Sequence, residues 1–333
     1  MALTVNTAFD EFMRNSVNLD PGIVSNARTS RDNLIENIAE FDDKDGFFDL
    51  CDSFNVHFGS FARKTKCREL DDIDLMIGIA ASGATYYAND SWDSVRITAS
   101  SSNDAQVECT RSDGTLNSTQ VLNRFRKKLE NVREYSRSEI HRNGEAVTLN
   151  LTSKDWSFDI VPCFHTVVES NGRSYYLIPN GNGNWKKTDP KKDRDHVINT
   201  NQEKNGRVLE LIRLCKWWNG NCNSARIPSY ILETMIINQC DNMDELSLRI
   251  DMRFRDSLKF IADHILLPIE DMKEIQGDIN TIDYIDRLLI KARANECYDK
   301  ACAAMKKESD DKDHHESINK WREIFGEEFP AYG

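Results

Sequence analysis

The sequence has little of what marks disordered, fibrous or membrane-spanning chains. It contains only 7 Pro and 15 Gly among 333 residues, which argues against low-complexity and collagen-like chains. Its longest apolar run, residues 75–81, is far shorter than the roughly 20 residues that a membrane helix needs. Residues 1–12 include acidic side chains and no apolar segment, so we expect no signal peptide. With 39% hydrophobic and 29% charged residues, the composition is typical of a folded, water-soluble protein of one large or two ordinary domains.

Basic residues are also in short supply. The chain has 43 Lys and Arg against 55 Asp and Glu, a formal net charge of −12. Proteins that bind long nucleic acids without regard to sequence usually carry a basic surface, so the charge balance argues against such a partner. Small anionic ligands are not excluded, because a phosphate group responds to the charges around its own site.

Cysteine is present but lacks the spacing of a metal or disulfide framework. The nine cysteines are scattered, form no CxxC pair and are odd in number. The closest pair, Cys297 and Cys302, has no histidine or cysteine partners at zinc-binding spacing. We therefore expect reduced thiols in a cytoplasmic protein, without structural zinc.

The pattern of apolar residues divides the chain into an α/β half and a helical half. The first forty residues read as helical, with Ser30 as an expected helix cap. After residue 199, helical stripes predominate, and the residues between 180 and 200 suit a mobile loop or lid. The expected strands are residues 54–58, 73–79, 147–151 and 157–161, and the expected stripes include Val208, Leu211, Ile212 and Cys215, then Ile231, Leu232, Met235 and Ile236, and finally Ile279, Ile282, Ile285, Leu288 and Leu289.

The stretch HFGSFARKTKCRELDDIDLMIGI, residues 57–79, carries the clearest chemical signal. Asp72 and Asp74 alternate with apolar residues, so they share one face of a strand. Paired carboxylates repel each other unless a cation relieves the charge, and hard oxygen ligands favour Mg²⁺ or Mn²⁺. Gly59 and Ser60 follow an apolar strand, and Asp72 comes twelve residues after Ser60. Such a turn can hold a terminal phosphate.

Asp159 is the candidate third acid, because it is set in the apolar strand segment WSFDIVP, residues 156–162. Three strand-borne carboxylates meet the needs of a two-metal phosphoryl-transfer site. Taken alone, a DxD sequence is often a solvated turn, and Gly-Ser is often a simple turn. The order of the three elements, each beside a strand, is more specific than any one of them.

These residues resemble the GS…DxD…D pattern of the nucleotidyltransferase superfamily, and specifically the CD-NTases, which are relatives of cyclic GMP-AMP synthase and oligoadenylate synthetase. Three later segments support the likeness, residues 175–190, 207–219 and 227–233, and it covers roughly residues 30–240. The resemblance implies an α+β fold of the polymerase-beta type: a mixed-sheet catalytic core over 1–195 with an N-terminal spine helix, a helical nucleotide-binding lobe over 196–333, and an active site in the cleft between them.

The resemblance also implies roles for individual residues. Asp72, Asp74 and Asp159 match the catalytic, metal-binding acids, with two Mg²⁺ ions per site or Mn²⁺ in their place. The implied nucleotide- and phosphate-binding residues are Gly59, Ser60, Lys216, Ser229 and Tyr230, followed with less support by Arg63, Thr65 and Trp185.

Several of these residues have a structural interpretation as well. Lys216 borders the apolar stripe of its helix, so its stem could simply cover a neighbouring tryptophan. Ser229 could cap its helix, Tyr230 could pack in the core, and Trp185 could either stack on a base or anchor its loop. The sequence does not separate these alternatives.

The function implied is that of a cytoplasmic cyclic oligonucleotide synthase. It would join nucleoside triphosphates, ATP or GTP with pyrimidine nucleotides not excluded, through 3′–5′ or 2′–5′ bonds into a cyclic di- or trinucleotide, releasing pyrophosphate. The resemblance places such enzymes in bacterial anti-phage signalling of the CBASS type, with a nucleotide-sensing effector and, in some systems, a regulatory protein. The alternative is a nucleotidyltransferase that modifies an RNA end, a protein or a small molecule, or that makes linear oligonucleotides. For residues 308–333, we expect docking on the chain's own helical half.

Overall fold

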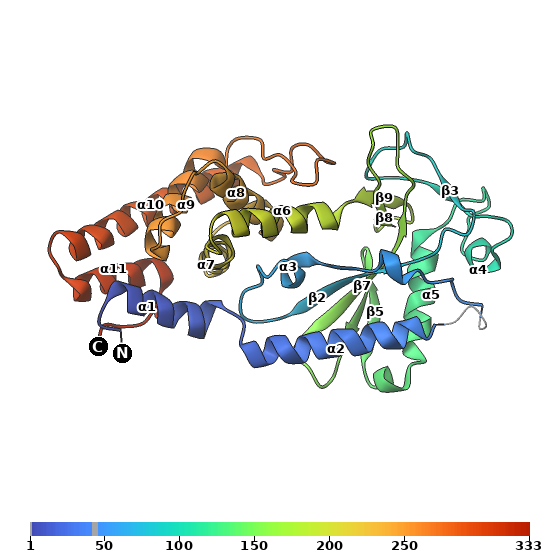
Figure 1. The fold of residues 1–333 in the computed structure, drawn as a ribbon, viewed down its shortest axis with the longest axis horizontal. Coiled ribbons are helices and arrows are strands. Elements are labelled where there is room, and N and C mark those ends of the chain that lie inside the picture. The colour runs from blue at the N-terminus through green and yellow to red at the C-terminus, as the bar shows by residue number, and fades with distance from the viewer. Residues whose placement is uncertain (1, 42–45) are drawn as a thin grey trace. The chain divides into compact units, whose positions relative to one another are not determined.

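The computed structural model describes residues 2–41 and 46–333, and within them the chain forms two compact units. One unit comprises residues 21–63 and 70–194, and the other comprises residues 1–20, 64–69 and 195–333. The fold class expected from the sequence is confirmed: a mixed sheet is followed by a helical C-terminal region (Figure 1). The functional division into 1–195 and 196–333 stays a prediction. It assigned residues 1–20 and 64–69 to the catalytic core, whereas both segments belong to the helical unit.

The first unit is built on a seven-stranded mixed sheet in which β1, β2, β7, β6 and β5 lie side by side and β8 and β9 extend from β7. Among the described strands of this sheet, β2 and β7 run parallel and the other pairs are antiparallel. The strands are β1 (Val56–Phe58), β2 (Asp72–Gly78), β5 (Glu139–Asn143), β6 (Ala146–Asn150), β7 (Ser157–His165), β8 (Tyr176–Pro179) and β9 (Trp185–Thr188), with a separate pair β3 (Thr85–Tyr86) and β4 (Ile97–Thr98).

Helix α5 (Ser118–Glu130) packs on this sheet, mainly against β5 and β6. Its side chains at every third or fourth position, such as Val121, Leu122 and Phe125, are buried, as an amphipathic helix on a sheet requires. The other helical segments of this unit are α2 (Pro21–Ala39), η3 (Asp52–Phe54), α3 (Gly59–Ala62), α4 (Asp104–Val107) and η4 (Arg133–Tyr135).

The second unit is helical and has one large apolar core. Helix α6 carries the chain from the first unit into it. Its segments are α1 (Val5–Phe12), η1 (Met13–Val17), α6 (Pro190–Glu203), α7 (Val208–Gly220), α8 (Ser229–Asp241), α9 (Ile250–His264), α10 (Tyr284–Ser309) and α11 (His314–Phe325). In the described part of the chain, no helix combines the length and the apolar character that a membrane span demands.

The C-terminal segment docks on its own chain, as the sequence predicted. Phe9 of α1 packs edge-on against Trp321 of α11 with ring centroids 5.0 Å apart, and against Phe329 at 4.9 Å. All three side chains are almost fully buried, and aromatic pairs in this geometry are favourable. Both ends of the sequence therefore contribute to the core of the helical unit.

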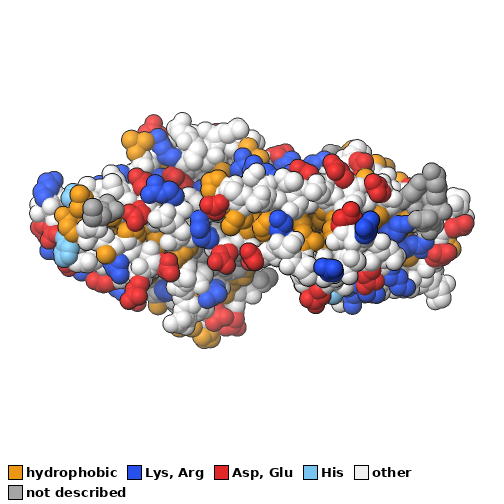
Figure 2. All heavy atoms as spheres, turned by 90° about the horizontal axis from the view of Figure 1, so that it is seen from below, with side chains coloured by type: hydrophobic (Ala, Val, Ile, Leu, Met, Phe, Trp, Pro, Cys, Tyr) orange, Lys and Arg blue, Asp and Glu red, His pale blue; other side chains and the backbone are white. Residues whose placement is uncertain are grey.

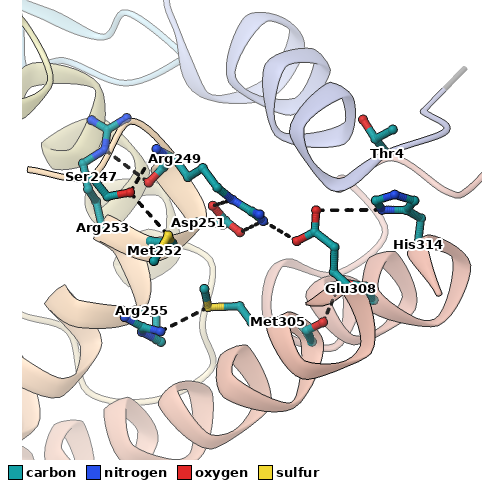
Figure 3. A network of polar contacts seen from close by, with 12 residues as sticks. Thr4, Ser247, Arg249, Asp251, Met252, Arg253, Arg255, Met305, Glu308 and His314 are labelled. Carbon is teal, nitrogen blue, oxygen red and sulfur yellow. Dashed lines mark hydrogen bonds and ion pairs between the residues drawn. The ribbon is translucent and has the colours of Figure 1, made fainter. Parts of the chain in front are cut away.

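A polar network ties α9 to α10 and α11 (Figure 3). Arg249 pairs with the buried Asp251 at 2.5 Å and also with Glu308. The other carboxylate oxygen of Glu308 lies 3.8 Å from Nδ1 of His314. Burying Asp251 without such a partner would be costly, so the network stabilises the junction of the three helices.

Three expectations about local structure were wrong. Ser30 lies inside α2, which begins at Pro21, because the chain enters the helix nine residues earlier than the apolar stripe suggests. The expected loop or lid over 180–200 is instead the β8–β9 hairpin followed by α6. Ile285 is 61% exposed and Leu289 is 48% exposed, so the third apolar stripe does not face the core over the first turns of α10.

Candidate active site

The first two acids lie on β2, at the end of the sheet where β1 turns into α3. Asp72 and Asp74 are half-buried, whereas Ile73 and Leu75 between and after them are buried on the opposite face. The period-two alternation predicted from the sequence is therefore confirmed. In the antiparallel pair with β1, Asp74 lies opposite Phe58, so the two residues that follow Phe58, Gly59 and Ser60, begin beside this acid.

The third acid comes into register with the second across a parallel strand pair. Asp159 of β7 lies opposite Asp74 of β2, and Thr148 of β6 lies opposite Asp159. The Thr148 hydroxyl donates a hydrogen bond of 2.6 Å to Oδ1 of Asp159. One row across the sheet thus carries Phe58, Asp74, Asp159 and Thr148, and its two carboxylates project from the same face because paired residues of neighbouring strands do so.

Gly59 is required by Asp74. Its φ angle is +72°, and a Cβ atom placed on it would lie 1.7 Å from Oδ2 of Asp74. No side chain fits in that space, and L-residues other than glycine are strained at this φ. Ser60 follows as the second residue of α3 and is partly exposed. Gly59 therefore lies against the carboxylate of Asp74, and Ser60 is the next residue along the chain.

An apolar cluster borders the acids on their own face of the sheet. Its buried members include Met76, Val161 and Cys163, with Phe58 packed against them. Met76 and Val161 come two residues after Asp74 and Asp159. On this face of the sheet, each strand therefore changes from an acid to a buried apolar residue at the next position. The acids therefore lie at the edge of this apolar cluster.

Two further polar residues near these elements are His57, which lies opposite Leu75 and so on the other face of the sheet from the acids, and Arg63, which follows α3. Burial, and next the charge of Arg31, lowers the pKa of His57 below its usual value of 6.5. Arg63 is buried, and its Nη1 lies 3.5 Å from Oδ2 of Asp193 on α6. The guanidinium is therefore engaged by a buried carboxylate in this conformation, and any role in phosphate binding stays a prediction.

The helical unit holds Lys216, Thr65 and Glu233 in one buried cluster. Nζ of Lys216 on α7 lies 2.8 Å from Oε1 of Glu233 on α8, and Oγ1 of Thr65 donates to Oε2 of the same carboxylate at 2.9 Å. The Glu233 side chain is fully buried and that of Lys216 is 10% exposed. Lys216 is therefore not a surface lysine whose stem merely covers a tryptophan, because its ammonium pairs with a buried carboxylate.

Ser229 and Tyr230 open helix α8 in the same unit. Ser229 is exposed and is the first helical residue, with Pro228 at the capping position. The Tyr230 hydroxyl donates a 2.8 Å hydrogen bond to Asp271, and Nζ of Lys273 lies 3.8 Å from the centroid of the Tyr230 ring. Burial alone would raise the pKa of Asp271, but Lys273 and the Tyr230 hydrogen bond outweigh it, so this pKa is lowered.

Trp185 differs from the sequence expectation. It lies on β9 rather than in a loop, and it is fully buried. Its indole N–H donates to the Leu116 carbonyl at 3.0 Å, and its ring packs edge-on against Phe164. Of the two interpretations open from the sequence, the structure fits the anchor of the hairpin, because a buried ring has no face to offer a base.

The carboxylates fit a magnesium site that is completed by substrate. Among residues 2–41 and 46–333, no three His, Cys, Asp or Glu side chains converge closely enough to form a metal site from protein groups alone. Magnesium does not require one, since it is usually held by one or two carboxylates together with phosphate oxygens and water. Asp74 and Asp159, side by side in register, are hard oxygen donors of that kind.

Four residues of these clusters were not found from the sequence: Thr148, Glu233, Asp271 and Lys273. Thr148 carried a weak signal, because it is the polar residue of the alternating strand next to Asp159. Glu233 carried a similar one, as an acid on the apolar stripe of α8. Asp271 and Lys273 lie in a loop whose position relative to Tyr230 no local pattern encodes.

Comparison with known protein families and structures identifies relatives of this chain. Residues 94–201 match the model of the SMODS family, the Second Messenger Oligonucleotide or Dinucleotide Synthetase domain. A probable cyclic nucleotide synthase of Bacillus cereus (strain VD146) is 40% identical over 336 aligned residues, which span 100% of this chain and 99% of the relative. A cyclic AMP-AMP-AMP synthase of an Acinetobacter species is 24% identical over 190 residues, spanning 55% of this chain and 53% of the relative.

The fold is similar to two solved CD-NTases. CdnC of Escherichia coli MS115-1, solved with ATP, matches with a TM-score of 0.70 and 16% identity over 98% of this chain and 99% of that one. DncV of E. coli, bound to 3′-deoxy GTP, matches with a TM-score of 0.55 and 15% identity over 83% of this chain and 69% of that one. Together with the full-length likeness to the Bacillus protein, these matches show that the chain belongs to the CD-NTase family of nucleotidyltransferases, the cyclic oligonucleotide synthases.

Proposed function

We propose that this enzyme binds nucleoside triphosphates at the acids of β2 and β7 and joins them into a cyclic di- or trinucleotide, with release of pyrophosphate. The observation that carries the proposal is the row in which Asp74 lies opposite Asp159 while Gly59 packs against the Asp74 carboxylate. Sites for phosphoryl transfer need carboxylates of this kind beside a turn that can approach a phosphate closely.

In this proposal some side chains bind the nucleotide and others hold the catalytic groups in place. Gly59 and Ser60 would approach a terminal phosphate through their backbone amides and the serine hydroxyl. Lys216 would hold the donor triphosphate, and Ser229, exposed at the start of α8, would donate its hydroxyl where free helix amides favour an anion. Tyr230 would stack on a base. Thr148 would keep Asp159 in place through its 2.6 Å hydrogen bond.

Asp72, Asp74 and Asp159 would hold Mg²⁺, or Mn²⁺ in its place, in a two-metal mechanism. When bound, such ions lower the pKa of the attacking ribose hydroxyl and neutralise charge on the transferred phosphate. The role left to the protein is to hold the carboxylates in alignment.

The biological setting we propose is bacterial anti-phage signalling in the cytoplasm, where the product would activate a nucleotide-sensing effector. All nine cysteines are free thiols, in keeping with a reducing compartment. Because CdnC of E. coli has been solved in a complex with HORMA-deltaN, we extend the proposal to control by a regulatory protein.

Long nucleic acid is not among the partners we propose. On the face seen in Figure 2, Lys and Arg side chains are interspersed with Asp and Glu rather than gathered in a stripe. Proteins that follow a phosphate backbone need a continuous basic track, and the formal net charge of −12 points the same way.

The test is mass spectrometry of the products formed from the four ribonucleoside triphosphates with Mg²⁺ or Mn²⁺. We expect phosphatase-resistant cyclic products from the wild-type chain. Asp74→Asn should reduce their formation by about a hundredfold or more, since such groups supply several kcal/mol of transition-state stabilisation.

Asp71→Asn is the matched control, because Asp71 is exposed and lies one residue out of phase with the acids. Its activity should stay within about twofold of wild type. Linear products, or label found only on an added RNA, protein or small-molecule acceptor, would favour the alternative transferase. Normal turnover by Asp74→Asn would refute the site.

A further inference from the structure

The buried carboxylate of Glu233 connects two parts of the chain that the sequence treated separately. One oxygen accepts from Nζ of Lys216 on α7 at 2.8 Å, and the other accepts from Oγ1 of Thr65 at 2.9 Å. Thr65 and Glu233 are both fully buried. A carboxylate in such a place is costly unless its partners are retained, so the three side chains form one unit.

Thr65 belongs to a short segment with an unusual place in the fold. Residues 64–69, which we term the strap, follow α3 with its Gly-Ser pair and lead into β2 with its DxD acids. Yet the strap is part of the helical unit. It makes up most of the connection between α3 and β2, residues 63–71, so its position bears on the turn before it and on the strand after it.

The strap is fastened to the helical unit at several points besides Glu233. Arg213 of α7 donates from Nη1 to the Lys64 carbonyl at 2.7 Å, and the Cys67 thiol donates to the Arg213 carbonyl at 3.2 Å. Arg68 donates its backbone N–H to the Val17 carbonyl at 3.0 Å. Thr65 differs from these anchors in one respect, because its partner also holds Lys216.

We propose that Glu233 is a positioning residue for nucleotide binding, which fixes the Lys216 ammonium through one oxygen and the strap through the other. The inference rests on the proposed function and adds to it. An ammonium has three N–H donors, so the bond to Glu233 orients Lys216 and leaves donors for phosphate oxygens. Thr65 holds the strap against the same carboxylate. Glu233 therefore connects Lys216 to the segment that directly follows the turn with Ser60.

A packing role alone would be served as well by apolar side chains. Replacing buried ion pairs by well-packed hydrophobic residues is often neutral or stabilising. The buried ion pair of Lys216 and Glu233, with the Thr65 hydroxyl beside it, is therefore better explained by orientation of the lysine than by stability.

The test is calorimetric binding of a non-hydrolysable ATP or GTP analogue in the presence of Mg²⁺, with thermal unfolding measured in parallel. We expect Glu233→Gln to weaken the Kd by about tenfold, or about 1.4 kcal/mol, because Lys216 loses its charged partner. Thr65→Val should weaken it by about threefold, whereas Thr65→Ser, which keeps the hydroxyl, should bind within about a factor of two of wild type.

The matched control is Asp251→Asn, which removes another buried carboxylate with an arginine partner in the same unit (Figure 3). It should lower the Tm as Glu233→Gln does while leaving the Kd unchanged. In the Glu233→Gln background, Thr65→Val should add little, because both changes act through one carboxylate.

The proposal is overturned if folded Glu233→Gln binds the analogue like wild type, if Thr65→Ser is as weak as Thr65→Val, or if the wild-type chain does not bind the analogue. Because the experiment measures binding, it tests the role of Glu233 independently of product formation. A chain that binds the analogue but makes no product would count against the proposed function, while the ratio of Kd values would still decide the role of Glu233.

Discussion

Gly59 and Asp74 are packed so closely that a single added carbon at residue 59 would overlap the Asp74 carboxylate: the Cβ would lie 1.7 Å from Oδ2. The contact joins the turn after β1 to strand β2. Because Asp74 also lies opposite Asp159, a displacement of its side chain would alter the spacing of the two carboxylates.

Gly59→Ala should therefore abolish nucleotide transfer while costing only modest stability. The φ angle of +72° contributes about 1–2 kcal/mol of backbone strain, and the clash must be relieved by moving Asp74. Gly172→Ala is the control, since Gly172 has a φ of +78° and nothing within 4 Å of its added Cβ. Both variants should lose similar stability in urea unfolding, and only Gly59→Ala should lose activity. Equal activity in the two would contradict the packing argument.

Thr148→Val should lower kcat by about tenfold while leaving the Tm within a few degrees of wild type. Valine has nearly the shape of threonine but cannot donate the 2.6 Å hydrogen bond to Asp159, so the third acid loses its orientation. Thr148→Ser keeps the hydroxyl and should retain most of the activity. Steady-state kinetics of product formation measures the difference, and a Val variant as active as the Ser variant would show that the bond has no catalytic role.

The common face of Asp72 and Asp74 was predictable because that information is local, whereas the partners of the other candidate residues depend on the fold. Asp72 and Asp74 alternate with apolar residues within one strand, and that pattern fixes which way they face. The partner of Lys216, by contrast, is a glutamate on the next helix, and the partner of the Tyr230 hydroxyl is an aspartate in a loop 41 residues later. No periodicity encodes such pairings. Trp185 was misplaced because a Gly- and Asn-rich hairpin has the composition of a loop.

Lower pH should destabilise the sheet unit through His57. Its folded-state pKa is lowered, with burial as the main cause, so the neutral form is favoured in the fold. The stability that this contributes is complete above the ordinary pKa of 6.5 and is lost as pH falls through the lowered folded value. Urea unfolding from about pH 7 to about pH 5 should show the loss, and His57→Gln should reduce its slope. An unchanged slope would assign the effect to other groups.

The exposed start of α10 should tolerate polar residues, contrary to the apolar stripe that its sequence suggests. Ile285 is 61% exposed and Leu289 is 48% exposed, while Ile290 next to them is fully buried. Ile285→Gln and Leu289→Gln should change the free energy of unfolding by no more than about 0.5 kcal/mol. Ile290→Gln should cost about 3 kcal/mol or more, because it removes buried apolar area and buries an amide. A large loss for the first two would mean that this turn packs against something in solution.

Lys273→Ala should tighten the binding of nucleotides if Tyr230 stacks on a base. In the structure the Lys273 ammonium lies 3.8 Å above the Tyr230 ring, so a base that stacks on that face must displace it. A cation over an aromatic ring contributes about 0.5–2 kcal/mol, and stacking of a base about 1–3 kcal/mol; removing the first should therefore lower the Kd by a few-fold. Lys259→Ala, at a surface lysine whose partner is Asp263, should leave the Kd unchanged.

The same measurement separates base stacking from a purely structural role of Tyr230. Its hydroxyl bond to Asp271 is lost in Tyr230→Phe, which keeps the ring, whereas Tyr230→Ala loses both. If the ring stacks on a base, the Phe variant should bind the nucleotide nearly as well as wild type, and the Ala variant about tenfold or more weakly. If instead the Phe and Ala variants lose affinity and Tm in parallel, the contact with Asp271 is what matters, and the aromatic face is part of the core.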